Sequence, residues 1–156
     1  MDEIKVDIIS YSEQYITDFA QLNFEWLEKY FYIEEYDKEV LTNPEKYILD
    51  EGGQILYALI DGKAVGTVAL IKRDEGVFEL SKMAVTEDYK GLRIGQKLMY
   101  ACIDYAGKHG VKRLFLDSNR TLIPALKLYD KVGFKEIPTP EDTLYERADI
   151  RMELYL

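Results

Sequence analysis

Apolar residues in the first part of the chain follow a strand period and then a helical one. Residues 5–9 read as a short strand. From Tyr15 onward, apolar residues recur every three or four positions, which predicts an amphipathic helix with its apolar face made by Tyr15, Phe19, Leu22, Trp26 and Tyr30. Ser10 and Glu13 form the S-x-x-E pattern that begins a helix. A second, shorter helix is expected over residues 35–41, before Pro44 and Gly52-Gly53 break the pattern.

The middle of the chain predicts three consecutive strands. The apolar runs cover residues 55–60, 64–71 and 77–85. Asp61-Gly62 between the first two is a strong two-residue hairpin signal, and Asp74-Glu75-Gly76 makes the next turn. These strands are therefore expected to form an antiparallel meander.

The pattern changes in the second half of the chain. A helix is expected over residues 94–108, with Ile94, Leu98, Cys102 and Tyr105 on one face, followed by a strand over 113–117. A strand, a helix and a strand in this order imply a parallel crossover. Residues 122–132 read as another helix, with Pro124 in its first turn and Gly133 at its end, and residues 134–137 and 150–155 as closing strands. The predicted fold is α+β (mixed α/β), with a mixed, mostly antiparallel sheet and helices on both faces.

Length and composition narrow the class of protein. A chain of 156 residues is expected to form a single domain, residues 1–156. The net charge of −9 argues against nucleic acid or an anionic membrane as a partner. This acidity either attracts a cationic small molecule or only keeps the protein soluble. The single Cys and the single His argue against an internal disulfide and against a metal site.

Targeting signals are not evident in the sequence. The N-terminus has no basic-then-apolar signal pattern, and no apolar run approaches the roughly 20 residues that span a bilayer. The single cysteine fits a reducing compartment. A cytoplasmic location is therefore expected.

The segment between the third meander strand and the next helix carries the strongest chemical signal. Gly91 and Gly95 lie in it, and Lys90, Arg93 and Lys97 add positive charge. A helix that begins after such a loop presents unpaired N–H groups at the positive end of its dipole. This arrangement predicts a site for phosphate, and in particular for a pyrophosphate.

Two segments together resemble the GNAT superfamily of N-acetyltransferases. Residues 85–98 resemble the family's Q/R-x-x-G-x-G/A loop, and residues 125–134, A-L-K-L-Y-D-K-V-G-F, resemble its A-x-x-L-Y-x-x-x-G-F segment. Lys90 stands where glutamine or arginine is usual, and Arg93 stands where the middle glycine is expected. The resemblance implies a GNAT-like sheet that is splayed at an acetyl-CoA site.

The same resemblance implies a binding mode for acetyl-CoA as cosubstrate. The pyrophosphate is expected on the backbone N–H groups of Lys90, Gly91, Leu92, Arg93, Ile94, Gly95 and Gln96. The pantetheine arm is expected to pair with Met83, Ala84 and Val85 as an added strand. Asn119 either hydrogen-bonds the pantetheine or is a turn residue.

Two residues are candidates for proton transfer. Tyr129 stands at the position of the family's general acid, and its alternative role is a core tyrosine. Glu79 is the candidate base, because an alkyl ammonium with a pKa near 10.4 is neutral only about one time in a thousand at pH 7. Strand alternation predicts Glu79 on the same face as Val77, Ser81 and Met83; its alternative is an exposed charge. Cys102 lies in an apolar stripe, so direct attack in a ternary complex is favoured over a covalent intermediate.

The acceptor side is expected to be aromatic and acidic. Trp26, Tyr30, Glu34 and Tyr36 are the candidates for holding an ammonium group, or else they form an ordinary helix face. The function that follows is N-acetylation of a primary amine, with a small molecule as acceptor. Protein N-terminal or lysine acetylation, and a non-catalytic acyl-CoA-binding module, are the alternatives. A homodimer is the assembly expected from the family.

Overall fold

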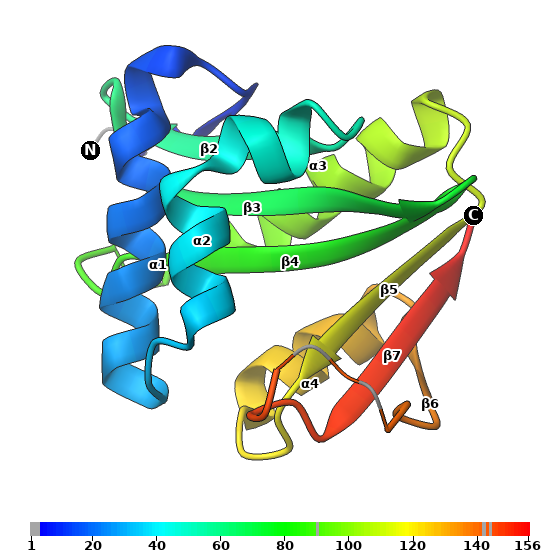
Figure 1. Cartoon of the computed structure of the whole chain (residues 1–156). Coiled ribbons are helices and arrows are strands. Elements are labelled where there is room, and N and C mark those ends of the chain that lie inside the picture. The colour runs from blue at the N-terminus through cyan, green and yellow to red at the C-terminus, as the bar shows by residue number, and fades with distance from the viewer. Residues whose placement is uncertain (1–3, 90, 142, 144) are drawn as a thin grey trace.

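The described part of the chain contains a seven-stranded sheet with the strand order β1-β2-β3-β4-β5-β7-β6 (Figure 1). The computed structural model describes residues 4–89, 91–141, 143 and 145–156. The strands are β1 (Asp7–Ser10), β2 (Gln54–Ile60), β3 (Lys63–Asp74), β4 (Val77–Val85), β5 (Arg113–Ser118), β6 (Lys135–Ile137) and β7 (Ile150–Tyr155). The helices are α1 (Ile16–Tyr30), α2 (Glu35–Thr42), α3 (Ile94–Lys108) and α4 (Ile123–Lys131), with the short turns η1 (Glu13–Tyr15) and η2 (Glu45–Leu49).

The strand pairing confirms the predicted mixed sheet. β1 to β4 pair antiparallel in succession, and β7 pairs antiparallel with both β5 and β6. The parallel pair is β4 with β5, joined through α3 as the strand–helix–strand pattern predicts. Asp61 and Gly62 both have positive φ, 50° and 77°, as expected for the two-residue turn between β2 and β3.

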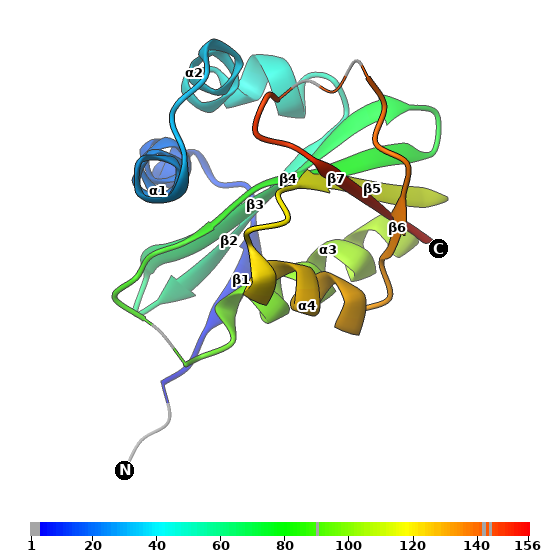
Figure 2. The same cartoon turned by 90° about the horizontal axis from the view of Figure 1, so that it is seen from below.

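Helices cover both faces of the sheet (Figure 2). On one face α1 and α2 bury Phe19, Leu27 and Val40 against the sheet. On the other face α3 buries Leu98 and Cys102, with α4 beside it. The apolar residues that recur every three or four positions thus mark the buried sides of these helices, because an apolar stripe must be covered by another element.

The start of the first helix differs from the prediction. Ser10 is the last residue of β1 and does not cap a helix. A 3₁₀ turn begins instead at Glu13, with Ser12 in extended conformation before it, and α1 follows. The S-x-x-E prediction was therefore wrong, because pairing of Ser10 with Leu56 continues β1 through this residue.

β4 and β5 separate soon after they begin to pair. Three residue pairs join them, Val77 with Arg113, Phe78 with Leu114 and Glu79 with Phe115. Beyond this point the two strands diverge, while β5 continues to pair with β7 (Figure 1). The predicted splay is confirmed, and the β5-facing edge of residues 80–85 has no ladder partner within the described sheet.

A bulge at Lys82 reverses the alternation of β4. Lys82 has a left-handed backbone with φ of 56°, and the pairing with β3 shifts by one residue between Ser81 and Ala84. Phe78 and Leu80 pack on the α3 side, and so do Met83 and Val85. The expectation that Met83 shares a face with Glu79 was therefore wrong, because the extra residue changes the phase between them.

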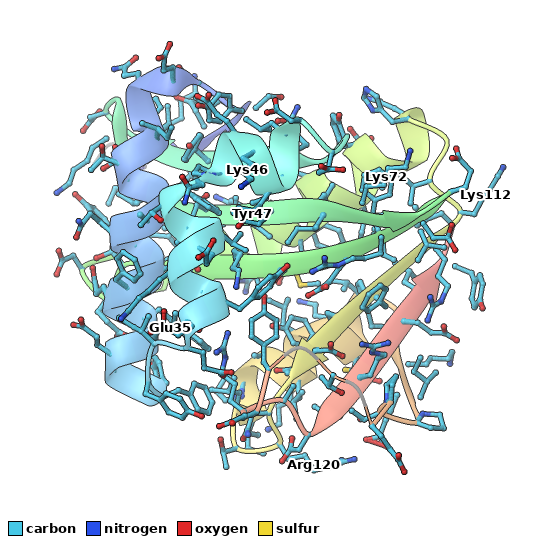
Figure 3. All side chains as sticks on the ribbon, viewed as in Figure 1. Glu35, Lys46, Tyr47, Lys72, Lys112 and Arg120 are labelled. Atoms are coloured by element: carbon cyan, nitrogen blue, oxygen red, sulfur yellow. The ribbon has the colours of Figure 1, made fainter. Side chains whose placement is uncertain are left out.

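The outside of the molecule is rich in charged side chains (Figure 3). Lys112 and Arg120, just before and just after β5, are both exposed, and Arg120 pairs with Glu136 of β6 (Figure 3). Among the described residues, no helix combines the length and the apolarity that crossing a bilayer requires.

Candidate active site

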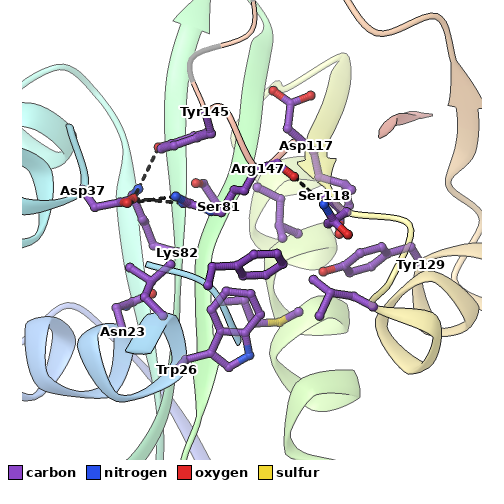
Figure 4. A pocket seen from close by; sticks show the side chains of 17 residues that line it. Asn23, Trp26, Asp37, Ser81, Lys82, Asp117, Ser118, Tyr129, Tyr145 and Arg147 are labelled. Carbon is purple, nitrogen blue, oxygen red and sulfur yellow. Dashed lines mark hydrogen bonds and ion pairs between the residues drawn. The ribbon is translucent and has the colours of Figure 1, made fainter. Parts of the chain in front are cut away.

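A pocket lies where β4 and β5 separate (Figure 4). The pocket is lined by residues of α1, α2, β4, the end of β5, α4 and the loop before β7. Asn23 and Trp26 come from α1, Lys82 and Met83 from β4, and Tyr129 from α4. Because the strands diverge here, side chains from both faces of the sheet reach one cavity.

Tyr129 presents its hydroxyl to this pocket (Figure 4). Its ring packs on the α3-side core and lies 6.4 Å from the ring of Phe134. Burial raises the pKa of Tyr129 to about 12, and the side chain of Ser118 works in the opposite direction. The hydroxyl is therefore protonated at neutral pH and can donate a hydrogen bond into the cavity.

Glu79 lies at the base of the separation. Its side chain is 3% exposed, and Oε1 accepts a hydrogen bond from Arg73 Nε at 2.9 Å, with Arg73 Nη2 at the same distance. Glu79 is not among the described residues that line the pocket. Any proton that it takes from the pocket must therefore pass through an intermediate group such as water.

The predicted phosphate loop leads into α3. Arg93 precedes the helix in a left-handed conformation with φ of 55°, and Gly91 has φ of 81°. The N–H of Lys97 bonds to the Arg93 carbonyl, so Ile94, Gly95 and Gln96 supply the first-turn N–H groups that no helical carbonyl can reach. Leu92 packs on the α3-side core. Lys90, also predicted here, lies outside the described residues.

The predicted pantetheine contacts lie on two sides of the gap. Met83, Ala84 and Val85 belong to the part of β4 whose β5-facing edge lacks a strand partner. Across the gap, Asn119 lines the pocket, and its Nδ2 donates to the Arg147 carbonyl at 2.6 Å. Asn119 Oδ1 also accepts from the N–H and the hydroxyl of Thr121, so this side chain fixes the turn after β5.

The four predicted acceptor-side residues do not come together. Trp26 lines the pocket, whereas Tyr30 is 44% exposed and donates to Glu87 at 3.1 Å. Tyr30 lines a neighbouring apolar slot that shares Trp26, Phe31 and Leu122 with the pocket. Glu34 caps α2, and the ring of Tyr36 packs 5.7 Å from that of Tyr145.

A buried charged cluster that the sequence analysis missed forms one end of the pocket. Lys82 Nζ donates to Asp37 Oδ1 at 2.9 Å and to the Tyr145 hydroxyl at 2.7 Å. Arg147 donates to both oxygens of Asp37 at 2.9 Å and to Glu34 Oε2 at 2.7 Å. These contacts attach the loop before β7 to the start of α2. A lysine inside an apolar strand was the available signal for Lys82, but nothing in the local sequence marks Arg147.

Burial and the neighbouring charges shift the pKa values of the groups in this cluster. Burial opposes ionisation of Asp37, but hydrogen bonds from Arg147 and Lys82 outweigh it and lower the pKa of Asp37. Burial lowers the pKa of Lys82, against the opposite effect of Asp37. Burial also raises the pKa of Tyr145, and the negative charge of Glu79 is the next cause.

The single Cys and the single His have structural roles. Cys102 is buried in α3, and burial raises the pKa of its thiol, which makes it a poor nucleophile. His109 Nδ1 lies 2.8 Å from the Tyr105 carbonyl, and the two rings stack. The described residues contain no group of three or more His, Cys, Asp or Glu that could hold a metal ion.

Comparison with known proteins identifies the family. Residues 19–134 match the model of the acetyltransferase (GNAT) family. The chain belongs to the GNAT family. The match includes most of α1 and all of α4, so it covers the elements that build the pocket except the loop that carries Tyr145 and Arg147.

Two curated proteins are similar to this chain in sequence. The probable N-acetyltransferase camello of Xenopus tropicalis is 36% identical over 101 residues, which are 64% of this chain and 46% of the frog protein. The chain therefore matches less than half of that relative's length. An uncharacterized N-acetyltransferase of Schizosaccharomyces pombe is 30% identical over 126 residues, 78% of this chain and 77% of the yeast protein.

Solved GNAT structures share the fold. An acetyltransferase of the GNAT family from Staphylococcus aureus superposes with a TM-score of 0.86 at 25% identity, over 97% of this chain and 99% of that one. The PaiA N-acetyltransferase of Thermoplasma acidophilum, in complex with coenzyme A, gives a TM-score of 0.74 at 20% identity, over 98% and 100% of the two chains. At 20% identity, the similarity to the Thermoplasma protein supports a shared fold only.

Proposed function

We propose that this protein is an acetyl-CoA-dependent N-acetyltransferase that acts on a primary amine of a small molecule. The observation that carries the proposal is the pocket between the separated strands, where the protonated Tyr129 hydroxyl faces the unpaired edge of β4. Such an edge can accept an extended ligand through main-chain hydrogen bonds. Membership of the GNAT family supports the same chemistry.

The α3 end of the site suits the pyrophosphate of coenzyme A. The first-turn N–H groups of Ile94, Gly95 and Gln96 point out of the helix at the positive end of its dipole. Arg93 adds a positive charge beside them. Lys131 Nζ donates to Gln96 Oε1 at 3.1 Å, so a second cation lies near the same helix end. We assign the diphosphate to this end and the pantetheine to residues 83–85 and Asn119.

The reaction forms an N–C bond and breaks the C–S bond of the thioester. The amine attacks as the free base, and the thiolate leaves with a pKa of about 8.5. Tyr129, with a pKa raised to about 12, donates a hydrogen bond to the departing sulfur. The proton lost by the amine passes through water to Glu79, the candidate base at the base of the gap. Because Cys102 is buried in α3, attack occurs directly in a ternary complex.

The shape of the acceptor side favours a small molecule over a protein. Tyr145 and Arg147 line the pocket, and Arg147 is attached to Asp37 of α2 and to Glu34. The cavity volume is about 90 Å³. A lysine on a folded protein needs an open groove, and a cavity of this size suits a small acceptor better.

Two measurements test the proposal. Calorimetry with acetyl-CoA measures binding, and a thiol-release assay over small amines, diamines, amino sugars, amino acids and peptides measures transfer. We expect saturable acetyl-CoA binding and thiol release that depends on a small amine. Binding without amine-dependent release would favour a non-catalytic acyl-CoA-binding module, and release with peptides alone would favour protein acetylation.

A further inference from the structure

The hydrogen-bonding groups of the pocket indicate which amines it accepts. Resting on the function proposed above, we infer that the acceptor carries a carboxylate near its amine, as an amino acid does, and that Lys82 and Arg147 recognise it. The donors and acceptors that the protein does not already use decide which groups of a ligand the pocket can bond.

Asp37 has no capacity left for a substrate ammonium. Its Oδ1 accepts from Lys82 Nζ and Arg147 Nη2, and its Oδ2 accepts from Arg147 Nη1 and the backbone N–H of Glu34, each at 2.9 Å. These bonds fill both lone-pair positions of both oxygens. The residue is fully buried, so this carboxylate cannot turn towards a ligand.

The other carboxylates close to the pocket are also engaged. Asp117 accepts from Arg151 Nε at 2.7 Å and Nη2 at 2.9 Å, and its carboxylate points away from the cavity (Figure 4). Glu34 accepts from Arg147 and from the backbone of Glu146. Glu79 pairs with Arg73. Among the described residues, the carboxylates that line the pocket are Asp37 and Asp117, and both are paired with arginine. A second ammonium on the substrate, as in a polyamine, would meet no unpaired carboxylate there, and an unpaired buried charge is costly.

Some hydrogen-bond donors of the pocket, in contrast, are not used by the protein itself. The Lys82 ammonium has one more N–H than its bonds to Asp37 and Tyr145 use. The Arg147 guanidinium likewise has N–H groups beyond its bonds to Asp37 and Glu34. Both side chains line the pocket. A carboxylate that accepts these N–H groups would form charge-assisted hydrogen bonds.

The same end of the pocket offers one side-chain acceptor for the amine. Asn23 is 3% exposed and lines the cavity from α1. Its Nδ2 donates to the Phe19 carbonyl at 2.9 Å, which fixes the amide so that Oδ1 faces away from its own helix backbone. Among the described residues, Oδ1 has no donor of its own. An acceptor with an amine beside a carboxylate therefore matches both kinds of group.

Matched substrate pairs test the inference without any mutation. Thiol release is measured with phenylalanine against 2-phenylethylamine, with alanine against ethylamine, and with lysine against cadaverine. Each pair differs only in the carboxylate. We expect kcat/KM at least about ten-fold higher for the member with the carboxylate. Equal rates, or faster rates with ethylamine or cadaverine, would overturn the inference and leave the acetyltransferase function intact.

A binding measurement separates this inference from the proposed function. With the protein saturated by coenzyme A, calorimetry compares N-acetylphenylalanine with N-(2-phenylethyl)acetamide. Tighter binding of the carboxylate is expected even if no amine drives thiol release, an outcome that would reject only the enzymatic function. Equal binding would reject carboxylate recognition.

Two variants then assign the preference to residues. Lys82→Met and Arg147→Gln are each expected to raise KM for phenylalanine at least about ten-fold, with a smaller change for 2-phenylethylamine. Lys112→Gln, on an exposed side chain outside the pocket, is the control and should retain the preference. A folded Lys82→Met or Arg147→Gln protein that keeps the full preference would exclude the residue concerned.

Discussion

Glu79 of β4 and Phe115 of β5 form the last facing pair before the two strands separate. The carboxylate of Glu79 therefore lies at the inner end of the gap, held by Arg73, and its charge contributes to the raised pKa of Tyr145. This placement suits a group that receives a proton from the pocket without touching the substrate.

Replacing Glu79 by glutamine tests this role. Glu79→Gln keeps an oxygen for the Arg73 bond but removes the basic site. We expect kcat to fall by about 10²-fold and the rise of kcat with pH to weaken, since a positioned base contributes about 10²–10⁴-fold. The KM for acetyl-CoA should change little. Glu153→Gln is the control, because Glu153 also pairs with an arginine on the sheet, Arg113, outside the pocket; equal losses in both variants would refute the role.

Tyr129→Phe removes one hydroxyl and keeps the ring against Phe134. We expect kcat to fall by about 10- to 100-fold, because the hydroxyl assists a leaving group that is already fair. The melting temperature should stay within a few degrees. Steady-state kinetics at saturating acetyl-CoA measure the effect, with Tyr105→Phe on α3 as the control. Turnover equal to that of the unchanged protein would exclude Tyr129 as the donor.

Arg93→Gly tests two properties of the predicted phosphate loop separately: the backbone conformation at this position and the positive charge of the side chain. The left-handed φ of 55° is unfavourable for arginine and natural for glycine, so the free energy of unfolding should not fall and should rise by up to about 1 kcal/mol. The affinity for coenzyme A should fall and depend less on salt, because a cation is lost. Denaturant unfolding and calorimetry at two salt concentrations measure both effects. Arg93→Lys should keep most of the affinity, and an unchanged affinity in Arg93→Gly would show that the charge is not used.

The pKa of Asp37 predicts an acid-sensitive loop. This pKa is lowered below its ordinary value of 3.8, so the folded state binds this proton less readily than the unfolded chain does. The resulting stability is complete above pH 3.8 and is lost as the pH falls through the lowered pKa. Asp37→Asn should lack this component of the acid transition. It should also lose on the order of 3 kcal/mol at pH 7, because Lys82 and Arg147 are left without their partner.

Unfolding curves from pH 7 to pH 2 measure the Asp37 effect. Asp7→Asn is a suitable control, since Asp7 is an exposed strand residue whose ion pair with Lys5 is also exposed. A variant at Asp37 with the same pH dependence as the unchanged protein would contradict the assignment.

Local patterns predicted the elements well, and residues distant in sequence explain the errors. The bounds of β4, α3 and β7 agree with the sequence prediction, because apolar periodicity and turn residues determine them locally. The face of Met83 was mispredicted, since the left-handed conformation of Lys82 breaks the alternation and no glycine marks it.

The acceptor end of the site was the least predictable part. Glu34 reads as an acidic group available to an ammonium, whereas its carboxylate accepts from Arg147, over a hundred positions away in the chain. Only the folded chain shows which partner each carboxylate has. Tyr129 and the loop before α3 were more accessible to prediction, because each lies within a short contiguous motif.

The extra residue in β4 divides this strand into two segments that can change separately. Glu79 and Ser81 face the side of α1 and α2. After Lys82 the in–out alternation of side chains is shifted by one residue, so Met83 and Val85 face the α3 side. In the proposed mechanism, a substitution in the earlier segment alters the side of the base Glu79, and one in the later segment alters the edge assigned to the pantetheine. The two segments of this one strand therefore face different surroundings and can be substituted independently of each other.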